Sequence, residues 1–107
     1  MIAQEYLTIC LIEELAELQQ ALSKCLRFGP HDHHPSKDSK MTNLEDAKKE
    51  LSEVFGILGM LNNFGVPLEA NEKLAGEKVE RTLSFMQYSK EQGVISETSD
   101  ISPSKQS

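Results

Sequence analysis

The chain has 107 residues and a mass of 12.0 kDa, the size of one small domain. Seventeen acidic against eleven basic side chains give a net charge of -6, which argues against a general nucleic-acid or membrane-surface binder. A chain of this length buries only a modest core, so we expect it to assemble with copies of itself.

The cysteines and the start of the chain indicate a cytoplasmic protein. Cys10 and Cys25 fall on one predicted helix, roughly 22 Å apart at 1.5 Å per residue, which is too far for a disulfide. The first residues have no basic segment of the secretory type, and no apolar run reaches membrane-spanning length. We therefore expect reduced thiols and no membrane partner.

The first predicted helix covers residues 2–28 and ends at Gly29-Pro30, a strong stop signal. Its apolar stripe is Leu7, Leu11, Leu15, Leu18, Leu22 and Cys25. Glu14 lies about 60° from this stripe and Glu17 about 120°, with Glu13 beyond Glu17 on the same flank. Such like charges repel one another, which favours a bound cation, although for this triplet alone a solvated acidic face is the more usual explanation.

Residues 29–43 form a polar loop, and we expect residues 30–43 to be flexible. His31, His33 and His34 lie in this loop beside prolines. Because the loop lacks the fixed geometry of a helical or zinc-knuckle site, the pattern disfavours a histidine metal centre.

The second predicted helix is capped by Thr42 or Asn43, has Glu45 three residues after Thr42 as in a capping box, and runs to about Asn63. Its apolar stripe is Ala47, Leu51, Val54, Ile57, Leu58 and Leu61. Glu50 falls within about 40° of Val54, inside the stripe, and Glu53 falls at its edge. An unpartnered charge there costs several kcal/mol, so Glu50 is protonated, paired or bound to a cation. Asp46, one turn earlier, is a candidate outer-shell group.

The third predicted helix opens at Val66-Pro67 and runs to about Tyr88. Its heptad-like seam consists of Leu68, Ala75, Val79, Leu83 and Met86. We expect one helical domain over residues 1–92 and a disordered tail over residues 93–107. The fold class predicted from these elements is an all-α antiparallel bundle of three to four helices, completed by homo-oligomerisation.

Carboxylates spaced i, i+3 on two neighbouring helices predict a metal site across the helix interface. We name Glu14, Glu17, Glu50 and Glu53 as the ligands. An all-oxygen set favours Mg²⁺, with Mn²⁺ as the alternative, and such ions hold phosphates and activate water. Basic side chains then bind the remaining phosphate charge, and the candidates are Lys24, Arg27, Lys78 and Arg81.

The spacing Glu13-Glu14-x-x-Glu17 followed by Glu50-x-x-Glu53 resembles the EExxE…ExxD signature of the MazG-like nucleotide pyrophosphohydrolases, particularly the short phage and bacterial type. Lys78 and Arg81 stand where that family has the Lys and Arg of an N-x-K-x-x-R element. The resemblance covers roughly residues 5–88, with Glu53 in place of the usual Asp and Gly76 in place of the usual Asn.

The resemblance implies hydrolysis of a nucleoside triphosphate, ribo or deoxy, to the monophosphate and pyrophosphate. The five glutamates would then form the catalytic site, with Glu13 as a further ligand or as the group that orients the attacking water. It also implies a homodimer or homotetramer.

Two other interpretations stay open at this stage. One is a regulatory or interaction dimer that keeps the helical fold without catalysis, and the other is a purely structural helical dimer with solvated acids. The structural dimer predicts that Glu50→Leu stabilises the protein and changes nothing else.

Overall fold

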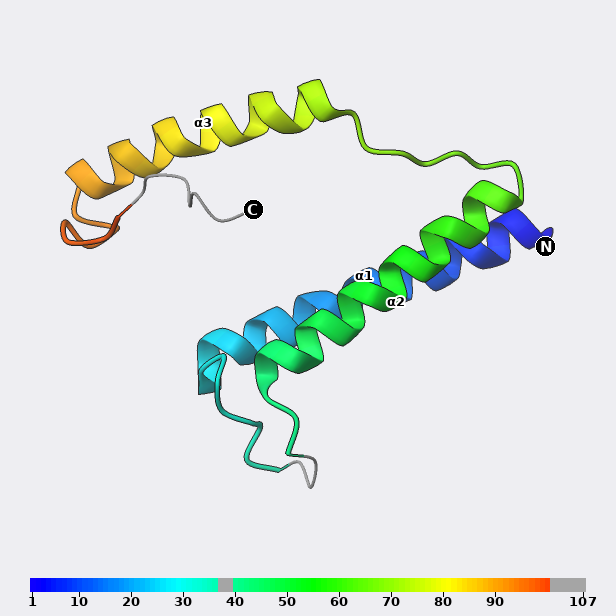
Figure 1. Cartoon of the computed structure of the whole chain (residues 1–107), viewed down its shortest axis with the longest axis horizontal. Coiled ribbons are helices and arrows are strands. Elements are labelled where there is room, and N and C mark those ends of the chain that lie inside the picture. The colour runs from blue at the N-terminus through cyan, green and yellow to red at the C-terminus, as the bar shows by residue number, and fades with distance from the viewer. Residues whose placement is uncertain (37–39, 101–107) are drawn as a thin grey trace. The chain divides into compact units, whose positions relative to one another are not determined.

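The computed structural model describes residues 1–36 and 40–100, and within these ranges the chain is all-helical. The three helices are α1 (Ala3–Phe28), α2 (Asn43–Asn63) and α3 (Glu72–Glu91), shown in Figure 1. The first two confirm the predicted helices almost to the residue. None of the helices in the described ranges has the length and apolar character needed to cross a bilayer.

The prediction for the start of the third helix was wrong, because α3 begins at Glu72 rather than at Val66-Pro67. The Val66 N–H donates to Leu61 O (2.9 Å) and the Leu68 N–H to Val66 O (2.9 Å), so this segment closes the end of α2. The start of α3 is fixed instead by Asn71, whose side chain accepts the Leu74 N–H at 3.0 Å.

The chain divides into two compact units, Met1–Leu68 with α1 and α2, and a second that begins at Glu69 and contains α3. In the first unit α1 and α2 lie side by side and antiparallel (Figure 1). At one end Gln4 Nε2 donates to Phe64 O (3.0 Å), and at the other Asn43 Nδ2 donates to Gly29 O (2.9 Å). These bonds help to fix the register of the two helices. The single domain expected over residues 1–92 stays a prediction.

The core of the first unit is narrow and is centred on Leu7, Leu11, Val54 and Leu61. Ala21 and Ala47 are also buried. Three residues predicted as core are instead exposed, namely Leu15 (47%), Leu22 (52%) and Leu51 (45%). The reason is geometric, since one neighbouring helix covers only part of a wide apolar stripe.

Leu22 and Leu51 line an apolar groove of about 250 Å³ between α1 and α2, together with Leu18, Leu44, Ala47 and Lys48. On α1, Leu15 and Leu22 flank the stripe on the side away from Glu14, at about 100° per residue. The helix pair therefore has one acidic edge and one apolar edge.

Helix α3, all of whose residues are described, contains no buried side chain. Leu83 and Met86 of the predicted seam are half-buried, whereas Leu68 and Val79 are exposed. Beyond α3, the Lys90 Nζ donates to Ser99 O (2.9 Å), and the Ser99 N–H donates to Ser96 O (3.0 Å). Residues 93–100 of the predicted tail thus form hydrogen-bonded turns, and residues 101–107 lie outside the described residues.

Candidate metal centre

Four glutamates of the first unit come together across the α1–α2 interface: Glu14 and Glu17 from α1, Glu50 and Glu53 from α2. Residues three apart in a helix point to the same side, so each helix presents two carboxylates to the other. One oxygen from each side chain lies within 4.8 Å of the others. The group could hold a metal ion.

Burial and mutual repulsion disfavour the state in which all four carboxylates of this cluster are ionised. Burial, followed by the hydrogen bond and charge of Glu53 and then those of Glu17, raises the pKa of Glu50 from 4.5 to about 7. The pKa of Glu14 is also raised, first by burial and then by the charge of Glu17 and by Glu53. The cluster therefore favours either a retained proton or a positive ion between the carboxylates.

Two oxygens in this cluster are buried without a hydrogen-bond partner: Oε2 of Glu14 and Oε2 of Glu50. A buried acceptor that nothing satisfies costs about 1–3 kcal/mol, and a bound cation removes that cost. The orphaned oxygens come from opposite helices and belong to one cluster, so the residues present fit a cation.

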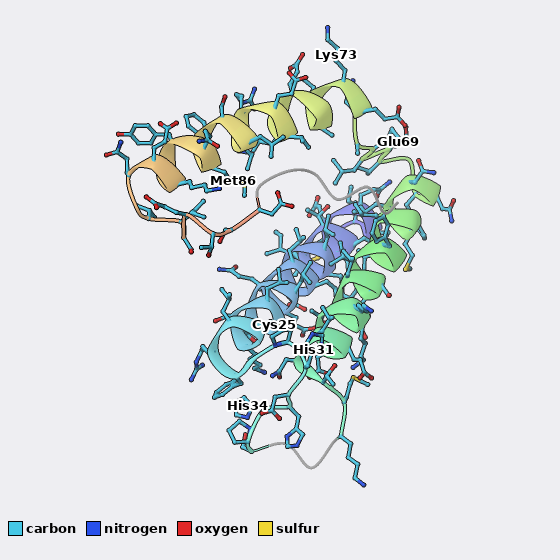
Figure 2. All side chains as sticks on the ribbon, turned by 60° about the vertical axis from the view of Figure 1, so that its left-hand side comes forward. Cys25, His31, His34, Glu69, Lys73 and Met86 are labelled. Atoms are coloured by element: carbon cyan, nitrogen blue, oxygen red, sulfur yellow. The ribbon has the colours of Figure 1, made fainter. Side chains whose placement is uncertain are left out.

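The donor set indicates which cation fits. Carboxylate oxygens without a nitrogen or sulfur ligand suit Mg²⁺ or Mn²⁺ better than zinc. His31 and His34 lie in the loop between α1 and α2 (Figure 2), and His34 packs edge-on against Phe28 with ring centroids 4.7 Å apart. The described histidines do not belong to the glutamate cluster.

A cavity of about 280 Å³ adjoins the cluster and shares Glu17 and Glu50 with it. The rest of its lining comes from the end of α1 and the start of α2: Gln20, Ala21, Lys24, Asn43 and Asp46. Lys24 thus lines this cavity, and its phosphate-binding role stays a prediction.

The other predicted site residues are not members of the four-glutamate cluster. Glu13 is exposed and does not belong to the cluster. Arg27 places its guanidinium 4.8 Å from the centre of the Phe28 ring. Lys78 and Arg81 are exposed on α3, in the second unit. Glu53 carries a long ion pair with Lys49 at 3.9 Å.

The cavity also contains two amide side chains, Gln20 and Asn43, that sequence reasoning did not assign to the site. The sequence predicted Thr42 or Asn43 as the helix cap, and the structure confirms Thr42, whose Oγ1 accepts the Glu45 N–H at 3.1 Å. The available signal was its register, since Asn43 falls within about 20° of Val54 on the helical projection. A polar residue on a core stripe indicates a buried polar contact.

Comparison of the chain with protein-family models, with curated proteins and with solved structures finds no match.

Proposed function

We propose that this protein is a Mg²⁺-dependent nucleoside triphosphate pyrophosphohydrolase that converts a ribo- or deoxynucleoside triphosphate to the monophosphate and pyrophosphate. The observation that carries the proposal is the convergence of four glutamates from two helices, with two buried oxygens that lack a partner. The choice of reaction comes from the spacing of these glutamates in the sequence, which resembles that of the MazG-like enzymes.

Glu14, Glu17, Glu50 and Glu53 would hold the ion, with Mn²⁺ as a substitute. When bound, such an ion neutralises phosphate oxygens and lowers the pKa of a water molecule. Glu13, on the outer flank of α1, would orient the attacking water by accepting one of its protons in a hydrogen bond.

The phosphate charge needs cationic side chains as well. Lys24, in the wall that adjoins the glutamate cluster, would bind phosphate oxygens of the substrate. Arg27 at the end of α1, and Lys78 and Arg81 on α3, would add charge once substrate is present. In this proposal α3 of the same chain or of a partner copy supplies the last two residues.

We also propose that α1, α2 and α3 form an antiparallel bundle completed in a homodimer or homotetramer. The first unit has few buried apolar side chains, and α3 has none. Leu74, Val79 and Phe85 on α3 are each more than half exposed, at 62%, 55% and 68%. A small domain with so little core usually gains stability by assembly.

The direct test is a pyrophosphate-release assay with purified protein, Mg²⁺ and a panel of nucleoside triphosphates. We expect activity that requires the ion and falls at least about a hundredfold in Glu50→Gln, because this variant removes one ligand charge from the cluster. Glu45→Gln, on the same helix but outside the cluster, is the matched control and should keep full activity. Equal rates in the two variants would contradict the assignment.

A second candidate function is a metal-stabilised interaction or regulatory dimer without catalysis, and the exposed apolar side chains of α3 favour it. Both candidate functions require the bound ion, but only the enzyme hydrolyses a nucleoside triphosphate. Saturating Mg²⁺ or Mn²⁺ at about 100 times Kd should stabilise the folded chain by about 2.7 kcal/mol, a rise in melting temperature of roughly 10–20 °C. That rise without hydrolysis of any triphosphate would favour the interaction dimer.

A further inference from the structure

The cavity beside the glutamates is small relative to a whole nucleotide. Its volume is about 280 Å³, and Glu17 and Glu50 form the wall that it shares with the cluster. Sites that enclose a complete drug-sized ligand occupy about 300–1,000 Å³. A ligand held at the cluster by its phosphates can therefore place a single ring system here, but not its whole length.

Asn43 is the most constrained polar residue in the cavity lining. It is 1% exposed, and its backbone N–H donates to Asp32 O at 2.7 Å. Its Nδ2 donates to Gly29 O at 2.9 Å, and because a carbonyl oxygen only accepts, this bond fixes which way the amide faces. The oxygen Oδ1 is thus left as an acceptor, and it is buried without a partner.

The surroundings of Asn43 favour a ligand that donates hydrogen bonds. The backbone N–H groups at the start of α2 are already used, since Leu44 donates to Pro30 O (3.0 Å) and Glu45 to Thr42 Oγ1 (3.1 Å). This helix terminus therefore does not offer its first donors to a phosphate. The carboxylates of Glu17, Asp46 and Glu50 add further acceptors to the lining. Gln20 and Lys24 are long side chains with the rotamer freedom to admit a ligand to the buried oxygen.

We propose that this cavity holds the base of the nucleotide, and that Asn43 Oδ1 accepts a hydrogen bond from an exocyclic amino group of that base. The inference rests on the nucleotide hydrolysis proposed above and adds a preference for amino-bearing bases. Cytosine presents an N–H donor at the position where uracil presents a carbonyl oxygen. Uracil would place that oxygen against Oδ1 and leave both acceptors unsatisfied, which is the kind of mismatch that polar sites reject.

The first test compares dCTP with dUTP, two substrates that differ at this one position of the base. We expect the wild-type protein to show a kcat/KM for dCTP at least about tenfold above that for dUTP. A ratio near one, or a preference for dUTP, would overturn the inference and leave the proposed hydrolysis intact.

The second test removes the acceptor. Asn43→Leu should lower the dCTP to dUTP ratio to near one, chiefly through loss of activity on dCTP. Thr42→Ala is the matched control, because it removes the side-chain cap of the same helix end and leaves Asn43 in place. Thr42→Ala should lose stability and keep the ratio, and loss of the ratio in this control would contradict a specific role for Asn43.

A third measurement needs no turnover and no folded variant. The side-chain amide resonance of Asn43 is followed by NMR while deoxycytidine or deoxyuridine is added at millimolar concentration to the wild-type protein with Mg²⁺. A shift with deoxycytidine that deoxyuridine does not produce supports the base site even if no triphosphate is hydrolysed. No shift with either nucleoside would overturn it.

Discussion

At Glu50 an acidic side chain projects from the face of α2 that also carries Val54 and Leu61. Burial raises its pKa to about 7, so near neutral pH the metal-free protein holds a mixture of protonated and ionised Glu50. This position was predictable from the sequence, because a glutamate within about 40° of Val54 on a helical projection lies on the apolar face of the helix, where a neighbouring helix is expected to pack.

The stability of the metal-free protein should depend on this one group. In the unfolded chain Glu50 titrates near 4.5 and in the folded chain near 7, so between these values the folded state binds more protons. The free energy of unfolding should therefore fall as pH rises from about 4.5 to about 7, by roughly 1–2 kcal/mol after allowance for solvent screening. Denaturant unfolding curves recorded at pH 5, 6 and 7.5 with a chelator present measure how the free energy of unfolding changes with pH.

Glu50→Gln is the control for this pH dependence, because an amide does not titrate. The variant should lose most of the slope and be more stable than the wild-type protein at pH 7.5 without metal. Mg²⁺ should reverse that order, since the wild-type protein alone keeps all four carboxylates. An unchanged slope in Glu50→Gln would mean that another group is responsible.

Asn43 is a residue whose role was not predictable from its neighbours in sequence. Its partners are Gly29 and Asp32, in the loop after α1, and the path of that loop decides where they lie. Periodicity places Asn43 on the buried stripe but does not identify the carbonyl that its amide meets. The glutamates were easier to assign because helical spacing alone brings each pair to one side.

At the level of the helices, the sequence correctly predicted that three helices exist among the described residues, but it did not predict how much of each apolar face is covered by neighbouring helices. Leu15, Leu22 and Leu51 lie on apolar stripes and yet are about half exposed. Periodicity shows which face of a helix is apolar, whereas the number and angle of neighbouring helices decide how much of that face is covered. The start of α3 was misplaced for a related reason, since Pro67 suits a turn as well as a first helical turn.

Two glycines give a matched pair of tests at the level of the helices. Gly76 lies inside α3, where an added Cβ meets nothing within 4 Å, so Gly76→Ala should stabilise α3 by up to about 1 kcal/mol. Gly29 ends α1 with φ of 92°, a conformation that favours glycine, so Gly29→Ala should destabilise the first unit by about 1–2 kcal/mol.

Thermal unfolding followed by circular dichroism at 222 nm measures the change in stability that each glycine substitution causes. The two substitutions add the same methyl group, so the opposite signs isolate the backbone conformation as the cause. If Gly29→Ala left the melting curve unchanged, the end of α1 would not depend on this left-handed residue.

For the molecule as a whole, all four clustered glutamates lie within Met1–Leu68, whereas Lys78 and Arg81 lie in the second unit. In the proposed enzyme the first unit therefore supplies the ion ligands together with Lys24 and Arg27, and the second unit supplies two further phosphate-binding side chains. Among the described residues, the six buried apolar ones all belong to the first unit, which leaves α3 dependent on whatever packs against it.

An unburied helix is also an accessible substrate for a protease. Among the basic residues inside helices, trypsin should cut after Lys78 and Arg81 faster than after Lys24, whose helix packs against α2. Mass spectrometry of timed digests gives the order of cleavage. If assembly covers α3, cleavage there should slow as protein concentration rises while cleavage after Lys40, in the loop before α2, keeps its rate. The rate of cleavage within α3 then measures how much of the protein is self-associated.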